Sequence, residues 1–205
     1  MFTVILRQSG AALRVLLVAT VVLGLIYPLA VWGVSRIPGL SGPAEGSLIT
    51  APDGTVVGSS LIGIDPVAAD PNADPYFHTR PSASAEDVLG PGDPSTSGGS
   101  NQGGFNDDLV AAVEQRRTLI AEREGVSPDR VPAEAVTASG SGVDPQISEA
   151  YAALQVPRVA RVTGLSEAEV AQLVAEHTQG RWLGVLGEPG VNVTELNLAI
   201  AAARG

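Results

Sequence analysis

The 205-residue sequence contains no cysteine and no lysine. Without cysteine, the chain cannot form a disulfide framework, a thiolate metal site or a cysteine nucleophile. Without lysine, it cannot supply the lysine of a phosphate-binding P-loop or of a Schiff base. All twelve basic residues are arginines, so several common classes of enzyme are excluded from the outset.

Basic residues are also scarce in most of the chain. Residues 1–36 contain Arg7, Arg14 and Arg36 and no acid, whereas residues 37–205 contain nine arginines and all 22 acidic residues, a net charge of −13. Nucleic-acid binding draws much of its affinity from neutralised phosphates. An acidic region without a basic cluster therefore predicts no nucleic-acid partner, and its charge is typical of a soluble domain.

Charge is wholly absent from residues 15–34, which read VLLVATVVLGLIYPLAVWGV. At ~1.5 Å per residue, a helix of this length spans the ~30 Å hydrocarbon core of a bilayer. Pro28 is tolerated in a membrane helix because neighbouring groups satisfy the freed carbonyl. The alternative is a cleaved secretory signal, which has a shorter apolar region of ~7–15 residues and a small-residue cleavage site. We therefore predict a single-pass membrane anchor that contacts lipid.

The arginines predict the orientation of this anchor. Arg7 and Arg14 precede it and only Arg36 follows closely. The positive-inside rule then places residues 1–14 in the cytoplasm and the C-terminal domain outside. The anchor also carries the small residues Ala19, Thr20, Gly24 and Ala30, which let another membrane helix approach closely. Gly24 is therefore a candidate contact with a membrane partner.

Beyond a Pro/Gly-rich linker at residues 35–46, residues 47–205 are expected to form one soluble domain. Asp53-Gly54 lies between two β-prone runs and predicts a hairpin. Residues 65–100 are rich in Pro, Asp, Ser and Gly without periodicity, which predicts an irregular loop. Helices are expected after Asn106 or Asp107, from Asp144-Pro145 to Gly164, after Ser166 in a capping box with Glu169, and after Asn192 in a similar motif with Glu195. The fold class is therefore α+β.

Catalytic and metal-binding motifs are weak. Ser139 and Ser141 lie near Asp144, but they lack the G-x-S-x-G arrangement that exposes a nucleophile, and no local histidine completes a triad. His78 and His177 are far apart in the sequence and have no second ligand at helical spacing, so no metal site is predicted. The Gly-rich run at residues 97–104 predicts a structural turn. The alternatives left open are a membrane-tethered hydrolase that uses Ser139 or Ser141, and a secreted binding module with a cleaved signal.

Several strings together resemble a known family. They are GSLI with DGTVVGSSLIG, DPYFHTRPSA, SGGSN, VTASGSGVDPQIS, LQVPRVARVTGLS and HTQGRWLGVLGEPGVNVTELNLAI. In this order, behind one N-terminal membrane helix, they resemble the C subunit of the bacterial Kdp potassium-transporting ATPase. The likeness runs from the anchor to nearly the last residue.

The resemblance implies a non-catalytic accessory subunit of an ATP-driven potassium import complex. Its implied partners are a channel-like potassium-binding membrane subunit and a P-type ATPase subunit that is phosphorylated on aspartate. The implied role is to stabilise the assembled complex and to raise the nucleotide affinity of the ATPase subunit. ATP and K⁺ are used by the complex, and no cofactor is expected on this chain.

Positions within or near these strings are candidates for partner contacts or family motifs. They are Tyr76, Phe77, Arg80, Ser82, Ser100, Asn101, Ser139, Ser141, Asp144, Arg158, Gly180, Arg181, Asn192 and Asn197. Three positions depart from the expected pattern: Ile64 replaces Gln, Gln146 replaces His, and Gly190 replaces Arg. These departures weaken the assignment of required contacts to those side chains.

Overall fold

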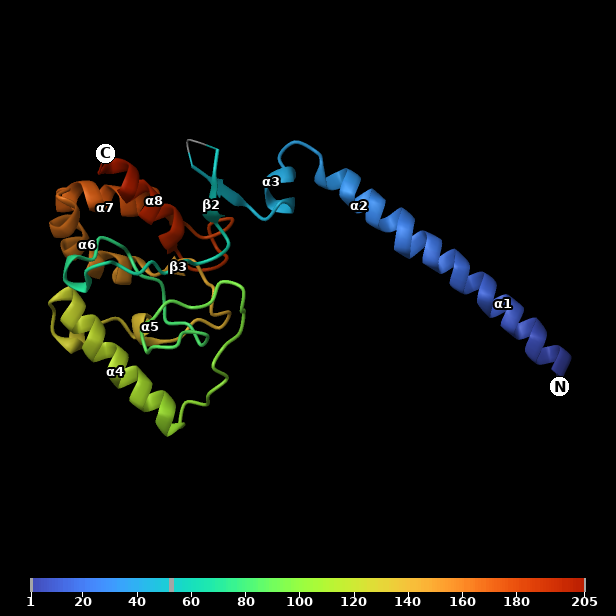
Figure 1. Ribbon diagram of the computed structural model, residues 1–205, viewed down its shortest axis with the longest axis horizontal. Coiled ribbons are helices and arrows are strands. Elements are labelled where there is room, and N and C mark those ends of the chain that lie inside the picture. The colour runs from blue at the N-terminus through green and yellow to red at the C-terminus, as the bar shows by residue number, and fades with distance from the viewer. Residues whose placement is uncertain (1, 52–53, 205) are drawn as a thin grey trace. The chain divides into compact units, whose positions relative to one another are not determined.

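In the computed structural model, which describes residues 2–51 and 54–204, the chain divides into two compact units, residues 1–47 and 48–205 (Figure 1). The first unit is dominated by one continuous helical segment, made of α1 (Phe2–Val21), η1 (Val22–Ile26) and α2 (Tyr27–Ser35). This segment is long and apolar enough to cross a membrane, and none of its side chains is buried within the protein. It begins earlier than the predicted span of residues 15–34, because no Pro interrupts residues 2–14.

Pro28 explains the change of helical register in the middle of this segment. Proline has no N–H and its ring collides with the carbonyl of the residue four positions before it, here Gly24. The backbone responds with a turn of wider π-helix at η1, in which the Tyr27 N–H donates to the Val22 carbonyl. The helix then continues through Pro28 as α2. The linker contains the short helix α3 (Ser41–Ala44).

The second unit starts with the predicted hairpin. Strands β1 (Leu48–Thr50) and β2 (Val56–Ser59) pair in antiparallel fashion, with a register shift after Ile49. Asp53, the first residue of the predicted turn, lies outside the described residues, whereas Gly54 has the positive φ of 86° that the turn requires. Residues 65–100 contain only one short 3₁₀ turn, η2 (Pro71–Ala73), as their composition predicts.

Helices supply most of the remaining domain. Helix α4 (Asp107–Glu124) is capped by the Asn106 side chain and ends at Gly125 with φ 67°. It is followed by η3 (Pro128–Arg130), α5 (Ala133–Val136), α6 (Glu149–Thr163), α7 (Glu167–Glu176) and α8 (Val193–Ala203). The capping box of Ser166 and Glu169 is present, and the Asn192 side chain accepts from the Glu195 N–H. These ends confirm the local signals in the sequence.

One helix start was predicted wrongly. The expected start at Asp144-Pro145 is occupied by strand β3 (Gln146–Ile147), and α6 begins only after Ser148, whose side chain caps it. The Asp144 carboxylate instead accepts from the Gln146 N–H and from Arg80. Ile147 is buried, so the apolar periodicity that suggested a helix there reflects a short core strand.

A second small sheet is formed by three strands from the C-terminal part of the domain. Strand β5 (Gly190–Asn192) lies between β3 and β4 (Thr178–Gln179), and both pairings are antiparallel. Val191 faces the core, where it is fully buried together with Leu196 of α8. The core is completed by apolar side chains of α4, α5, α6 and α7 and by Phe77 from the irregular segment.

Candidate functional site

An irregular segment around Phe77 and His78 is buried, and side chains form hydrogen bonds with its backbone as a neighbouring strand would. Asn197 of α8 accepts from the Phe77 N–H at 2.8 Å and donates to the Phe77 carbonyl at 2.8 Å. Gln155 of α6 accepts from the His78 N–H at 2.8 Å and donates to the His78 carbonyl at 3.3 Å. Each side-chain amide thus provides the donor and acceptor that a neighbouring strand would provide.

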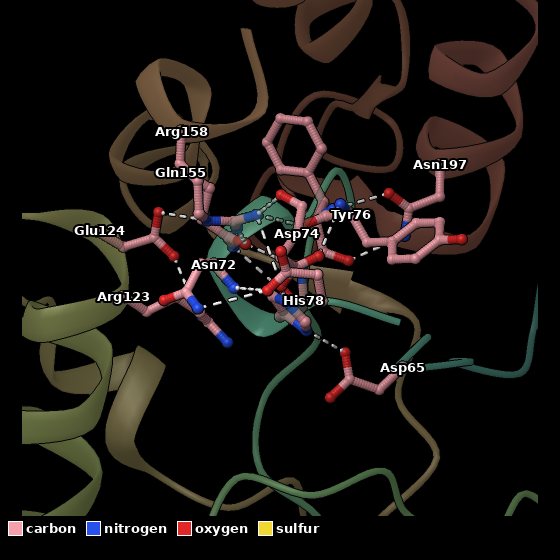
Figure 2. Close-up of polar contacts among 12 residues, drawn as sticks. Asp65, Asn72, Asp74, Tyr76, His78, Arg123, Glu124, Gln155, Arg158 and Asn197 are labelled. Carbon is pink, nitrogen blue, oxygen red and sulfur yellow. Dashed lines mark hydrogen bonds and ion pairs between the residues drawn. The ribbon is translucent and has the colours of Figure 1, made fainter. Parts of the chain in front are cut away.

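Arg158 of α6 binds the same segment from a position that is only 3% exposed (Figure 2). Its Nη1 donates to the carbonyls of Asp74 and Tyr76 at 2.8 and 2.9 Å, and its Nε donates to Glu124 at 2.9 Å. A buried guanidinium is tolerated only when its donors and its charge are satisfied. Arg158 therefore joins α4, α6 and the irregular segment at one point.

His78 lies between two carboxylates in the same region. Its Nδ1 is 2.7 Å from Asp65 and its Nε2 is 2.5 Å from Asp74. Burial raises the pKa of Asp74, but the hydrogen bond and charge of His78, the Tyr76 N–H and the charge of Arg158 outweigh burial and leave this pKa below its usual value. Asp74 is therefore held as an acceptor for its neighbours.

Glu124 connects Arg158 with a second buried cation. Arg123 Nε donates to Glu124 at 2.8 Å, and Arg123 Nη2 donates to the Tyr151 hydroxyl at 2.9 Å. Burial raises the pKa of the Tyr151 hydroxyl. We call Asp65, Asp74, His78, Arg123, Glu124, Tyr151, Gln155 and Arg158 the interior network.

An open cleft of 760 Å³ lies against this network. Asp65, Asp74, His78 and Arg123 contribute to its wall together with apolar residues such as Leu89 and Leu119. Among residues 2–51 and 54–204, however, no group of three His, Asp or Glu side chains has an arrangement able to hold a metal ion. Because the polar atoms of the network form hydrogen bonds with one another, the network stabilises the fold.

A second polar group surrounds Arg80. Its Nη2 lies 2.5 Å from Asp144, and its Nε lies 3.6 Å from Glu134. Burial raises the pKa of Glu134, and the Ser148 hydroxyl and the charge of Arg80 offset only part of this effect. Arg80 thereby ties the irregular segment to α5 and to the residues before β3.

The two candidate nucleophiles belong to a tight turn. Ser139 Oγ accepts from the Gly142 N–H at 3.0 Å, and Ser141 Oγ accepts from the Val143 N–H at 3.3 Å. The Ser139 N–H donates to the Pro81 carbonyl at 2.9 Å. Ser82 lies against this turn, since a Cβ at Gly142 would approach Ser82 Oγ to 3.0 Å. Within the described part of the chain, neither histidine is hydrogen-bonded to these serines.

Other candidate residues are on the surface. Ser100 and Asn101 are exposed in the Gly-rich loop, where Asn101 has φ 53° and its side chain donates to the Gly99 carbonyl. Gly180 and Arg181 are exposed after β4, and Arg181 pairs with Glu188 at 2.6 Å. Gly24 is exposed on the anchor, where a Cβ would meet only Thr20, at 3.9 Å.

The sequence of this chain matches that of a known family over most of its length. The family described as "K+-transporting ATPase, c chain" matches residues 9–202. The chain belongs to this KdpC family. It is therefore a subunit of a potassium-transporting ATPase complex, as the resemblance implied.

Relatives from several bacteria agree. A "Potassium-transporting ATPase KdpC subunit" of Kineococcus radiotolerans is 49% identical over 98% of this chain and 96% of its own. Proteins with the same description from Mycobacterium bovis and Sorangium cellulosum are 45% and 48% identical, and cover 95% and 97% of this chain and 97% and 100% of their own. The likeness therefore includes the anchor and the domain.

Two of the three departures from the expected pattern lie next to each other. A Cβ at Gly190 would approach the Gln146 Oε1 to 3.0 Å, and Gln146 donates to Gln179 at 2.9 Å. The space that a larger residue at 190 would need is filled by the Gln146 side chain. Ile64, the third departure, contributes its backbone N–H to Thr194 Oγ1 at 3.3 Å.

Sequence reasoning missed several members of the interior network. His78 was treated as an isolated histidine, and Asp65, Asp74, Glu124 and Gln155 were not singled out. The i, i+3 spacing of Gln155 and Arg158 on α6 was the available signal, because it places two long polar side chains on one helical face. Their partners could not be inferred, since Gln155 is 77 positions from His78.

Proposed function

We propose that this chain is a non-catalytic accessory subunit that stabilises an ATP-driven potassium import complex. The observation that carries the proposal is that the side chains able to act as nucleophile or base are hydrogen-bonded to other groups of the fold. The oxygens of Ser139 and Ser141 accept backbone N–H groups of their own turn, and His78 is held by two carboxylates. A nucleophile needs a positioned base, and these groups hold the fold instead.

The partners in this proposal are a channel-like potassium-binding subunit and a P-type ATPase subunit. ATP is hydrolysed by the latter, and K⁺ passes through the former. With Arg7 and Arg14 before the anchor and only Arg36 closely after it, the positive-inside rule favours an N-terminus in the cytoplasm and a domain outside. From that side the domain raises the nucleotide affinity of the ATPase subunit only by an indirect effect through the membrane subunits.

Affinity purification from detergent tests this assignment. A tag at the C-terminus of the full chain should recover two larger membrane subunits in a fixed ratio, together with potassium-stimulated ATP hydrolysis. A fusion of a compartment-specific reporter at the same end tests the orientation. Recovery of this chain alone contradicts the subunit assignment, whereas cytoplasmic reporter activity contradicts only the orientation.

The anchor is proposed to contribute to assembly by close helix packing. Thr20 and Gly24 share a face of the helix, and a side chain at Gly24 meets no other atom of this chain. Gly24→Leu should keep the segment in the membrane because leucine is more apolar, yet reduce recovery of the larger subunits. Gly33→Leu is the matched control, since Gly33 also has open space around it. If Thr20 and Gly24 can both be replaced by Leu without loss of recovery, the anchor only tethers the domain.

A further inference from the structure

A loop between β4 and β5 exposes a cluster of large apolar side chains. Trp182, Leu183, Val185 and Leu186 are between 53% and 75% exposed. We call these four residues the apolar loop. A domain that is otherwise acidic gains nothing for its own stability from such a cluster, and exposed apolar clusters mark surfaces that contact something else.

The loop is closed by its own backbone. The Trp182 N–H donates to the Leu186 carbonyl at 2.8 Å, and the Leu186 N–H donates to the Trp182 carbonyl at 2.9 Å. At the tip, Leu183 adopts φ 52°, a left-handed conformation that residues with a side chain rarely adopt. Arg181 and Glu188 pair at 2.6 Å on either side of the loop. The apolar side chains are thus presented by a preformed turn without net charge.

The strand and helix that directly follow the loop, β5 and α8, are bound to the part of the domain that follows the linker. Asn192, at the end of β5, donates to the Ser60 carbonyl at 2.9 Å, and Thr194 donates to the Ile62 carbonyl at 3.0 Å. Residues 60–62 follow directly after β2, so β5 and the start of α8 lie beside the segment after the first hairpin (Figure 1). The linker of residues 35–46 ends just before that hairpin. The tether therefore gives the loop a high effective concentration at the bilayer surface.

We propose that the apolar loop is a second membrane contact, which inserts into the boundary between lipid headgroups and acyl chains. Tryptophan prefers this boundary, and leucine and valine are favourable within its apolar side. The loop offers four exposed apolar side chains, far fewer than the ~20–30 residues that each partner contributes to a standard protein interface. The inference rests on the proposed membrane anchoring.

The charge of the domain indicates what kind of lipid contact this is. Residues 37–205 carry a net charge of −13, and Arg181, which directly precedes the apolar loop, is already paired with Glu188. Attraction to anionic lipid therefore cannot provide the binding energy, and apolar burial must. Insertion should be as complete in zwitterionic vesicles as in vesicles that contain anionic lipid.

Tryptophan fluorescence of the full chain tests the proposal, because the sequence contains only Trp32 and Trp182. Trp32→Phe leaves Trp182 as the only tryptophan in protein reconstituted into phosphatidylcholine vesicles. We expect brominated acyl chains to quench the fluorescence of Trp182. We also expect acrylamide to quench Trp182 several-fold less in vesicles than in a lipid-free detergent sample of the protein that has been unfolded with a water-soluble denaturant. Adding Leu183→Ser and Val185→Ser should reduce the lipid quenching several-fold.

A tryptophan elsewhere on the domain provides the matched control. Phe105 is fully exposed in the Gly-rich loop, so Trp32→Phe and Trp182→Phe combined with Phe105→Trp should give a tryptophan that brominated lipid does not quench. Trp182→Phe alone leaves Trp32, whose quenching reports insertion of the anchor separately. Trp32 therefore reports whether the anchor inserts, and Trp182 reports separately whether the apolar loop inserts.

The possible outcomes distinguish contact of the apolar loop with lipid from contact with another protein. Quenching of Trp182 by lipid, with none at position 105, supports the proposal. If Trp182 remains open to acrylamide in vesicles and becomes shielded only in the assembled ATPase complex, without lipid quenching, the loop docks on a protein and the membrane contact is wrong. Equal quenching at positions 182 and 105, or none at either, also overturns it.

Discussion

The interior network and the apolar loop reverse the usual distribution of side chains. The network buries charged groups such as Arg158 and Glu124, whereas the loop exposes groups such as Trp182 and Leu183. Within the network, Arg158, Glu124 and Asp74 are paired and hydrogen-bonded, because an unpaired buried charge would cost several kcal/mol. The apolar side chains of the loop expose more than half of their surface to solvent. The comparison indicates that the polar interior determines the fold and that the apolar exterior is available for contact.

The largest effect is expected from Arg158→Ala. The substitution removes one of the two cations that pair with Glu124, takes a cation away from Asp74 and frees two carbonyls, so we expect the free energy of unfolding of the domain to fall by about 3–5 kcal/mol. Arg161→Ala, on the exposed face of the same helix, is the control and should change it by less than about 0.5 kcal/mol. Urea unfolding of the full chain in detergent measures both. Equal effects would mean that the network does not hold the fold.

The next largest effect is expected from a buried valine, with an exposed valine of the apolar loop as its control. Val191 is fully buried in β5, whereas Val185 is in the apolar loop. Val191→Ser should cost about 2–3 kcal/mol, from lost burial and an unsatisfied hydroxyl. Val185→Ser should stay within about 0.5 kcal/mol. Chemical unfolding at one pH decides between them, and a large cost at Val185 would show that the loop supports the domain itself.

Two glycines test the same contrast through the backbone. A Cβ at Gly63 would lie 2.5 Å from the Asp144 carbonyl oxygen, whereas a Cβ at Gly180 would meet no atom within 4 Å. Gly63→Ala should therefore cost about 1–3 kcal/mol, because backbone must shift. Gly180→Ala should leave the midpoint of thermal unfolding nearly unchanged. A neutral Gly63→Ala would show that the segment after β2 is not fixed to the domain.

The smallest effect concerns the pH dependence of Asp74→Asn. The folded protein holds the pKa of Asp74 below its usual value, so its carboxylate stabilises the fold above the unfolded pKa of about 3.9. That contribution is lost as pH falls through the lower folded pKa. The difference in unfolding free energy between wild type and Asp74→Asn, about 1–2 kcal/mol, should persist at pH 5 and shrink below about pH 4. Titration of urea midpoints checks it, and a difference already absent at pH 5 would contradict it.

The sequence predicted those parts of the fold that depend on neighbouring residues. Asn106, Gly164 and Ser166 end or begin helices through contacts within a few positions, and each behaves as expected. The hairpin of β1 and β2 is equally local. The α+β class followed from these signals together.

The interior network could not be predicted because its partners are distant in the sequence. Asn197 pairs with Phe77 across 120 positions, and Arg158 reaches Asp74 across 84. Composition correctly indicated that residues 65–100 lack regular structure, but it concealed that Phe77 and His78 are buried. The wrong helix start at Asp144 has the same origin, because Arg80 recruits that carboxylate from 64 positions away.

Potassium-stimulated ATP hydrolysis by the assembled complex tests the non-catalytic role most directly. The complex should be purified with the Ser139→Ala and Ser141→Ala double variant, and separately with His78→Ala, and each rate divided by the amount of intact complex. Positioned nucleophiles and bases typically contribute ~10² or more to a rate. The account predicts turnover within a few-fold of wild type for both variants, whereas a loss of several orders of magnitude in an intact complex would contradict it.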